Sequence, residues 1–369
     1  MKKTAAIITM HCPLNYGAVM QTYAFQCYLE SLGLDVKIID YNPYYIIYDQ
    51  SLMYVGDDNY RTSLIRRWAY RLYKAPHKLK RIKNFSKFKK EELHLTKRFE
   101  SYDDIIKSCP QFDYYFCGSD QIWNVVSGAH KDPAYFLQWV EDKTKRFSYA
   151  ASGNLPLSDE VLNITIPMIN DLNGISMREK STIDIIQPFV KKEITHVCDP
   201  VFLLDETEWR KLASKNKNRG KSGHYVLVYP MGNGGENVTQ KGYELAQKLN
   251  LPLYKISSSQ RKDKRVDKLL NVPPYEFLQM IIECDYFVTN SFHGTAFSII
   301  FEKKFWSCVA EGSNQRLSSL LEVCGLSSRM ISSEYIFENP YEEIGFVSAK
   351  KNLNVFVSQS KSYINGIVL

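Results

Sequence analysis

The chain opens with a strand, a helix and a second strand in close succession, and this pattern constrains the fold more than any other feature. AAIITM is short and rich in β-branched and small apolar residues, and DVKIIDY at residues 35–41 has a similar character. Between them, NYGAVMQTYAFQCYLESLG places apolar residues at helical spacing and ends at Gly33, a typical C-cap. A β-α-β unit predicts a parallel sheet with helices on its faces.

The same rhythm of strand, turn and helix continues through both halves of the chain. In the first half it recurs in FDYYFCGSDQIWN, KRFSYAASGN, NGISMREKST and ITHVCDPVFLL. In the second half it recurs in HYVLVYP, LPLYKIS, DYFVTNSFHG and FWSCVA, with helical stretches between them. The polar, glycine-containing stretch NKNRGKSG at residues 216–223 is interpreted as the linker between two domains.

We therefore predict an α/β fold with two Rossmann-like domains facing a cleft, as in two-domain glycosyltransferases. A length of 369 residues suits two domains. The expected N-terminal domain covers residues 1–215, on the acceptor side, with a basic helical insert at about 60–100. The expected C-terminal domain covers residues 222–340, on the donor side, and residues 341–369 form a segment that packs back on the N-terminal domain.

Composition is that of an ordinary globular protein, with 44% apolar and 24% charged residues. No apolar run approaches the length of a transmembrane helix. The start MKKTAAIITM has an apolar part too short for a signal peptide, so we expect a first strand and a cytoplasmic protein. The eight cysteines form no CxxC pair and no cluster with metal spacing, so we expect reduced thiols and no metal site.

Positive charge is concentrated in one segment. The formal net charge is +7, and residues 61–100 contain 14 Lys or Arg against 3 Glu, with Trp68, Tyr70 and Tyr73 among them. Such a segment is typical of a solvated helical face or of a surface that contacts an anionic membrane. Because no nucleic-acid-binding motif is present, we expect no nucleic acid partner.

The stretch TNSFHGTAFSIIF places a histidine on the turn between a buried strand and a helix. His293 is the candidate acid–base group, since imidazole exchanges protons near neutral pH. Ser291 and Gly294 flank it, and Gly294 is expected to let the backbone approach a ligand at the helix N-terminus. The alternative is a histidine that only caps the turn.

Two arginines are candidate ligands for an anion. Arg178, in SMREKS, leaves a buried strand of the first half, where ligands of α/β sheets bind. Asn314 and Arg316, in SNQRLSSLL, lie at the start of a helix in the second half. The alternative for Arg316 is a surface salt bridge.

Two further turns carry groups suited to a hydroxyl-rich ligand. The first, in CGSDQIWN, offers hydrogen-bonding groups and a tryptophan that could stack on a sugar; its alternative is an Asx-turn packed under that tryptophan. The second, in HCPLNYGAVMQ, follows the first strand, and its alternative is a plain tight turn. The candidate acceptor-binding residues are Asp120, Gln121, Trp123 and Asn124 in the first turn, and Asn15, Tyr16 and Gln21 in the second.

Taken in order, these motifs resemble the polysaccharide pyruvyl transferase family. The ordered set is NYGAVMQTYAFQ, GSDQIWN, YAASGN, SMREKS, DPVFLL, NSFHGTAFS and NQRLSSLL, from about residue 5 to 330. The resemblance implies a fold like that of GT-B glycosyltransferases. It also implies transfer of pyruvate from phosphoenolpyruvate to sugar hydroxyls as a ketal, without another cofactor, in bacterial capsule, exopolysaccharide or cell-wall biosynthesis.

The resemblance also assigns roles. The family's histidine matches His293, its strand-end arginine matches Arg178, and its basic residue beyond the histidine matches Arg316. Many members carry arginine two residues before the histidine, where this chain has Ser291, so Arg316 is expected to supply that charge. The acceptor is expected to be a sugar or lipid-linked oligosaccharide, with peripheral contact to the inner face of the membrane through residues 61–100.

Two other functions remain open from the sequence. One is a glycosyltransferase that uses a nucleotide sugar and binds its pyrophosphate at the helix N-terminus near Gly294. The other is a non-catalytic, glycan-binding member of the same family.

Overall fold

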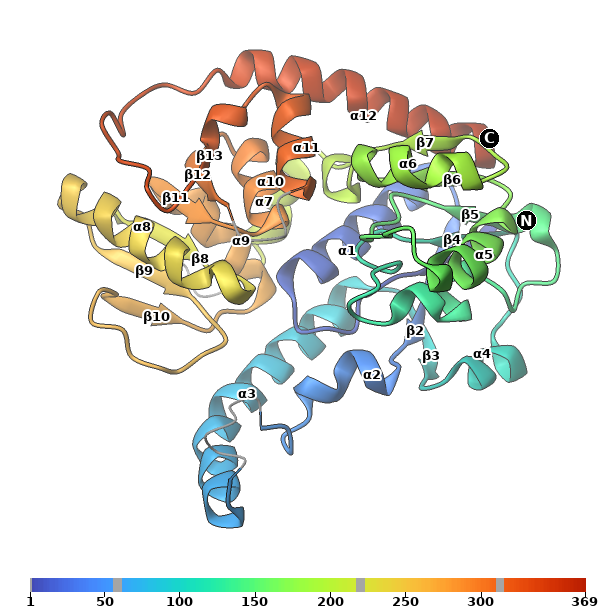
Figure 1. Cartoon of the computed structure of the whole chain (residues 1–369), viewed down its shortest axis with the longest axis horizontal. Helices are drawn as coiled ribbons and strands as arrows, with labels where there is room; N and C mark the ends of the chain where they lie inside the picture. Colours follow the sequence, from blue (N-terminus) through green and yellow to red (C-terminus); the bar gives the residue numbers. More distant parts are fainter. Residues whose placement is uncertain (1, 56–61, 217–222, 310–314) are drawn as a thin grey trace. The chain divides into compact units, whose positions relative to one another are not determined.

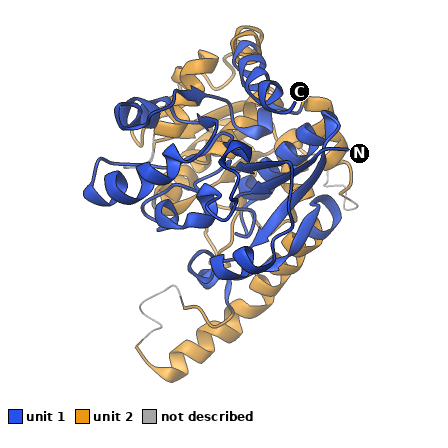
Figure 2. Ribbon diagram, turned by 90° about the vertical axis from the view of Figure 1, so that its right-hand side faces the viewer, with its two compact units in different colours: residues 1–51, 89–204, 355–369 blue, residues 52–88, 205–354 orange. Residues whose placement is uncertain are grey.

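A computed structural model describes residues 2–55, 62–216, 223–309 and 315–369 of the chain. It contains two compact units, each discontinuous in sequence (Figure 2). Unit 1 comprises residues 1–51, 89–204 and 355–369, and unit 2 comprises residues 52–88 and 205–354.

The units divide the chain at different points from those expected from the sequence. The second boundary falls between Leu204 and Asp205, ahead of the expected linker, of which residues 217–222 lie outside the described part. The basic segment is shared, since residues up to 88 belong to unit 2. The C-terminal segment is shared too, and only residues 355–369 belong to unit 1.

Unit 1 is built on a parallel sheet with the strand order β3-β2-β1-β4-β5. The strands are β1 (Thr4–Ile8), β2 (Asp35–Tyr41), β3 (Leu95–Phe99), β4 (Tyr114–Cys117) and β5 (Arg146–Ser148). A second parallel pair, β6 (Ile175–Met177) and β7 (Ile194–His196), is joined to the β5 side by the bridges Phe147↔Gly174 and Ala151↔Met177. Four of the five β1 residues are buried, as expected for a parallel strand covered on both faces.

Helices cover the faces of this sheet (Figure 1). They are α1 (Tyr16–Ser31), α2 (Tyr44–Ile47), α4 (Tyr102–Ser108), α5 (Ile166–Asn170), α6 (Lys180–Ile186) and the last part of α12 (Phe346–Val368). Helix α1 ends where the sequence predicts, because Gly33 follows it with a φ of 89°, a conformation that costs other residues more.

Unit 2 has a six-stranded parallel sheet with the order β10-β9-β8-β11-β12-β13. The strands are β8 (Val226–Tyr229), β9 (Leu253–Ile256), β10 (Lys268–Leu270), β11 (Tyr286–Thr289), β12 (Lys304–Cys308) and β13 (Met330–Ile331). The helices are α7 (Glu206–Ala213), α8 (Gly235–Leu249), α9 (Pro274–Glu283), α10 (Phe292–Ile300), α11 (Gln315–Cys324), most of α3 (Leu64–Glu92) and the first part of α12.

Strand and helix alternate in both units as the sequence pattern predicts, so the predicted α/β class with two Rossmann-like units is confirmed. In unit 1 the strand order reverses between β1 and β4, and in unit 2 it reverses between β8 and β11. In doubly wound sheets, ligands bind beyond the carboxyl ends of the strands at such a reversal. These two positions are therefore where a functional site is expected.

Candidate functional site

In unit 2, the reversal is followed by the turn that carries the histidine. Strand β11 ends at Thr289 and helix α10 begins at Phe292, so His293 stands in the first turn of the helix. Ser291 caps α10, because its side-chain oxygen accepts a hydrogen bond from the backbone N–H of Gly294 at 3.3 Å. The His293 side chain is largely buried, with 7% of the residue exposed. The helix start thus holds an imidazole beside backbone N–H groups, a position that favours anions.

The ends of β8 and β11 are tied together at this point. The amide of Asn290 accepts from the backbone N–H of Met231 and donates to the carbonyl oxygen of Met231, both at 2.7 Å. The Thr289 hydroxyl donates to the carbonyl of Tyr229 at 2.7 Å. These bonds hold the turn before His293 in one conformation.

Gly294 has a packing role at the start of α10. A Cβ at this position would lie 2.9 Å from Oγ1 and 3.0 Å from Cγ2 of Thr289. The missing side chain therefore lets α10 pack closely on β11. This packing gives one reason for a glycine here, and the expected approach of a ligand to Gly294 stays a prediction.

Another predicted donor residue of this half, Arg316, lies one helix further on. Arg316 is the second residue of α11, and α11 packs beside α10, the helix that carries His293. The guanidinium thus belongs to the helix next to the candidate acid–base group. Asn314 lies outside the described residues.

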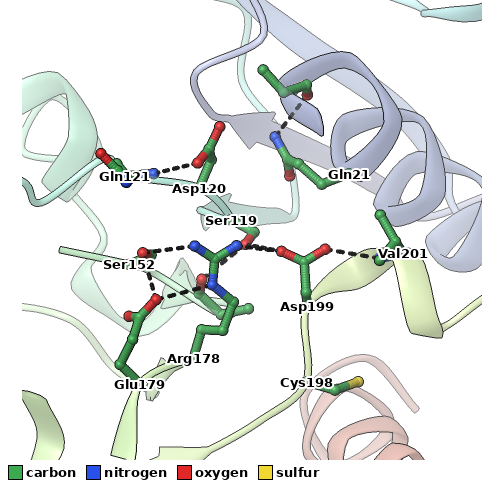
Figure 3. Close-up of polar contacts among 12 residues, drawn as sticks. Gln21, Ser119, Asp120, Gln121, Ser152, Arg178, Glu179, Cys198, Asp199 and Val201 are labelled. Atoms are coloured by element: carbon green, nitrogen blue, oxygen red, sulfur yellow. Dashed lines mark hydrogen bonds and ion pairs between the residues drawn. The ribbon is translucent and has the colours of Figure 1, made fainter. Parts of the chain in front are cut away.

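In unit 1, side chains from the ends of β5, β6 and β7 form a buried network (Figure 3). Arg178 follows β6, and its Nε donates to Glu179 at 3.0 Å. Its two terminal nitrogens donate to the carboxylate of Asp199, beyond β7, and to the hydroxyl of Ser152, beyond β5, the latter at 2.9 Å. The Ser152 hydroxyl also donates to Glu179 at 2.7 Å. Arg178 therefore joins three strand ends.

The charges of this network act on Arg178. Burial acts to lower the pKa of the guanidinium, but the charges of Glu179, Asp199 and Asp120 raise the pKa above its ordinary value. Because two carboxylates bond to one guanidinium, the cluster of three carries a net negative charge. The arrangement fixes Arg178 at the strand end in its charged form.

The remaining strand ends of unit 1 join the network through hydroxyl and amide groups. The Ser119 hydroxyl, beyond β4, donates to Asp199 at 3.3 Å. The Thr9 hydroxyl, beyond β1, donates to the carbonyl of Ser119 at 2.8 Å and accepts from the Gln21 amide at 2.9 Å. Gln21 is buried, and in the described part of the chain its Oε1 has no hydrogen-bond partner. The carboxyl edge at the β1–β4 reversal is thus polar.

The predicted acceptor turn in HCPLNYGAVMQ forms the start of α1. The Asn15 side chain accepts hydrogen bonds from the backbone of Gly17 at 2.9 Å and of Ala18 at 3.4 Å, and so caps α1. Tyr16 is fully buried. Capping and core packing account for these two residues in the described structure.

The predicted acceptor turn in CGSDQIWN is partly exposed and partly core. Asp120 has a φ of 66° and accepts from the backbone N–H of Gln121 at 2.9 Å, and Gln121 accepts from the Asn124 amide at 2.6 Å. Trp123 has no exposed surface, because its ring stacks on Phe136 with centroids 5.3 Å apart. A ring buried in this way stabilises the core, so the turn packed around a tryptophan describes Trp123 better than an exposed sugar platform.

Sequence reasoning did not identify one histidine at the carboxyl edge of unit 1. The Nε2 atom of His11 lies 2.9 Å from the Asp40 carboxylate, and the Asn42 amide donates to the same oxygen at 2.6 Å. Burial acts to raise the pKa of Asp40. The hydrogen bond and charge of His11 and the hydrogen bond from Asn42 hold the pKa below its ordinary value. The available signal was that His11 follows the first strand and Asp40 ends the second.

Sequence reasoning also assigned no role to the residues that bond to Arg178. Glu179 is paired with Arg178 and buried. Asp199 and Ser152 lie in two of the quoted motifs, DPVFLL and YAASGN, where no role had been assigned to them. Their common signal was a polar residue within a few positions of the end of a strand.

Among the described residues, no group of three His, Cys, Asp or Glu side chains could hold a metal ion. In the same part of the chain, no helix has the length and apolar character needed to cross a membrane. The eight cysteines all lie in this part, and none of them forms a disulfide.

The chain is an α/β protein with two Rossmann-like units, a fold similar to that of UDP-GlcNAc 2-epimerase from Methanocaldococcus jannaschii. A family model, polysaccharide pyruvyl transferase, matches residues 15–312. The chain therefore belongs to the polysaccharide pyruvyl transferase family. No curated protein sequence matches the chain at a significant level.

Solved structures with a similar fold include two UDP-GlcNAc 2-epimerases and a heptosyltransferase. UDP-GlcNAc 2-epimerase from Methanocaldococcus jannaschii has a TM-score of 0.50 at 11% identity, covering 96% of this chain and 92% of that chain. UDP-GlcNAc 2-epimerase from Neisseria meningitidis, bound to UDP-GlcNAc, has a TM-score of 0.46 at 9% identity, covering 100% and 94%. E. coli heptosyltransferase WaaC with ADP has a TM-score of 0.41 at 9% identity, covering 95% and 99%. At such identities the similarity concerns the fold alone.

Proposed function

We propose that this transferase moves pyruvate from phosphoenolpyruvate to two hydroxyl groups of a sugar, forming a ketal, in the biosynthesis of a bacterial surface polysaccharide such as a capsule or exopolysaccharide. The observation that carries the proposal is the position of His293 in the first turn of α10, beside the strand reversal of unit 2. Membership of the family supports the reaction class. Phosphoenolpyruvate is the co-substrate, and no other cofactor takes part.

The reaction needs proton transfer and charge stabilisation. A proton is delivered to the methylene carbon of phosphoenolpyruvate, which leaves an oxocarbenium-like centre. One sugar hydroxyl attacks this centre, phosphate leaves, and the second hydroxyl closes the ketal; of the two hydroxyl protons, one replaces the proton delivered and the other leaves with phosphate. His293 is assigned the acid–base role, because it is an imidazole at a helix start where an anion is favoured.

The donor is an anion with a carboxylate and a phosphate. Ser291 and Gly294, at the start of α10, and Arg316, in the adjacent α11, are proposed to hold it. The Ser291 side chain caps helix α10. Because many family members have arginine at this position, Arg316 is proposed to supply the positive charge here.

Arg178 is proposed as a further donor ligand. Its nitrogens are already held by Glu179, Asp199 and Ser152, so the guanidinium is oriented before any substrate binds. The proposal requires donor oxygens to join or replace these bonds. The polar residues at the β1–β4 reversal, with Asp120, Gln121 and Asn124, are proposed to bind acceptor hydroxyls.

The acceptor is proposed to be a sugar or a lipid-linked oligosaccharide at the cytoplasmic face of the membrane. Calorimetry with the full chain tests the donor directly. Phosphoenolpyruvate should bind and UDP-sugars should not. Binding of a UDP-sugar without binding of phosphoenolpyruvate would instead indicate a glycosyltransferase, and binding of glycan alone would indicate a non-catalytic member.

A further inference from the structure

One face of the long helix α3 exposes large apolar side chains to solvent. The side chains recur every three, four or seven residues, which places them along one line of the helix. Ile65, Trp68, Leu72 and Leu79 are 83%, 55%, 71% and 50% exposed. We call these four residues the apolar stripe. Single exposed apolar residues are common, but a continuous line of them marks an interaction surface.

The same line continues into positive charge. Lys83 and Lys87 follow Leu79 at steps of four residues, and both are exposed. Over its full length, α3 contains eleven Lys or Arg against two Glu. The outer face of the helix is thus apolar in its first half and basic toward its end.

The opposite face of α3 is already occupied within unit 2. Phe85 and Phe88 are fully buried, and the ring of Phe88 lies 5.0 Å from that of Tyr275. The amide of Asn271 donates to the backbone carbonyl of His77 at 3.0 Å. The first half of the helix extends away from the unit 2 sheet (Figures 1 and 2). The apolar stripe therefore lies outside the core that holds the helix.

We propose that this face of α3 docks the protein on an anionic lipid bilayer. The apolar stripe enters the boundary between headgroups and acyl chains, and Lys83 and Lys87 lie along the headgroups. Tryptophan is suited to this boundary because it joins a large apolar ring to an N–H donor. Arg71 lies 5.3 Å from the Trp68 ring, so a cation accompanies the anchor.

The charge and apolar character of this face favour an anionic bilayer over a second copy of the chain or a nucleic acid. A second copy of the chain would bring two strongly positive helices together, and like charges repel. A nucleic acid would attract the charges, but its phosphate backbone would give Ile65, Leu72 and Leu79 no apolar surroundings. An anionic bilayer satisfies both halves of the face.

Only the reason for docking rests on the proposed function, because docking would bring the enzyme to a lipid-linked acceptor. The docking itself uses residues of α3 and none of the residues assigned to donor or acceptor. The two proposals can therefore fail separately.

The test is flotation of the full chain with lipid vesicles. Vesicles of phosphatidylcholine with phosphatidylglycerol in equal parts should carry the protein, and vesicles of phosphatidylcholine alone should not. Binding should weaken as salt is raised, because the Debye length shortens. Equal flotation with both vesicles, or none with either, would overturn the proposal.

Two sets of variants assign the binding to this face. A triple variant of the stripe, with Ile65→Ser, Trp68→Ser and Leu72→Ser, should lose at least tenfold in vesicle partitioning. Lys83→Glu with Lys87→Glu should also lose at least tenfold, since each basic residue at an anionic surface contributes about fivefold. Matched controls use exposed residues elsewhere: Ile106→Ser, Val126→Ser and Val347→Ser for the stripe, and Lys262→Glu with Lys264→Glu for the charges. Equal losses in the controls would contradict a specific face.

Trp68 provides a direct probe of insertion. It is exposed, whereas Trp123, Trp209 and Trp306 are fully buried and Trp139 is partly buried. Anionic vesicles should shift the fluorescence emission to shorter wavelength in the wild type, and Trp68→Phe should abolish the shift while keeping most of the binding. A shift that survives Trp68→Phe would place insertion elsewhere.

The final comparison separates docking from catalysis. The stripe variant should release phosphate from phosphoenolpyruvate normally with a water-soluble acceptor and slowly with an acceptor held in vesicles. A His293→Ala variant should bind vesicles like the wild type. If the wild type binds vesicles but has no activity toward phosphoenolpyruvate, the docking stands and the proposed reaction falls.

Discussion

The guanidinium of Arg178, beyond β6, donates to the carboxylate of Asp199, beyond the neighbouring strand β7, and both side chains are buried. This bond joins two strand ends at the carboxyl edge of unit 1. Asp199 also accepts from the backbone N–H of Val201 at 3.0 Å, which fixes its orientation. The pair therefore balances a buried charge and fixes the position of the Arg178 side chain in the candidate site.

We predict that Asp199→Ala destabilises the protein by about 3–5 kcal/mol, because it leaves a buried guanidinium with one of its two carboxylates. Urea denaturation measures the change. The matched control is Asp184→Ala at the exposed Lys180–Asp184 pair, which should cost less than about 1 kcal/mol. A similar cost at both sites would contradict the structural role of the Arg178 network.

We predict that Arg316→Ala weakens binding of phosphoenolpyruvate by about 1.5–3 kcal/mol, because a charge-assisted bond to the donor is lost. Binding of the acceptor should change little. Calorimetry with each substrate measures both, and Arg261→Ala, an exposed arginine of unit 2, is the control. If acceptor binding is lost and donor binding is kept, Arg316 serves the other substrate.

We predict that Gly294→Ala destabilises the protein by about 1–3 kcal/mol, because its Cβ would press on both γ atoms of Thr289. Combining it with Thr289→Ser, which removes one of these atoms, should recover part of the loss. Gly366→Ala in α12 is the control, since no atom lies within 4 Å of its Cβ position and alanine favours helix. If Gly294→Ala unfolds at the same denaturant concentration as the wild type, close packing does not explain the glycine.

We predict that Asp40→Asn lowers stability by about 1–3 kcal/mol at pH 6, and by less in acid. The pKa of Asp40 lies below its ordinary value, so its ionised form stabilises the fold above that value. This contribution is lost as the pH falls through the lowered pKa. Denaturation of wild type and variant should therefore converge below about pH 4. A difference that stays constant as the pH falls below about 4 would show that the carboxylate charge does not matter.

Much of the fold could be predicted because local pattern and tertiary role agree. The β-branched stretches before Gly17 and after Gly33 became β1 and β2, and the turn before His293 became the start of α10. Placing His293 and Arg178 at strand ends needed only the order of elements, since ligand sites of parallel sheets lie at their carboxyl edge.

The rest depended on contacts that a linear pattern does not specify. The bond from Arg178 to Asp199 follows from the pairing of β6 with β7, and the burial of Trp123 follows from the position of Phe136. Both are tertiary facts. The discontinuous units could not be predicted either, because the basic segment looked like an insert in one domain, whereas residues 52–88 belong to unit 2.

We propose that His293 serves the transfer of pyruvate from phosphoenolpyruvate. The most direct measurement follows carbon-labelled phosphoenolpyruvate into a sugar acceptor while phosphate release is recorded, with wild type and with His293→Ala confirmed to be folded by circular dichroism. We expect one phosphate released per labelled ketal in the wild type, and a loss of about 10²–10⁴-fold in the variant. Near-normal turnover by folded His293→Ala, or phosphate release without label in the sugar, would contradict it.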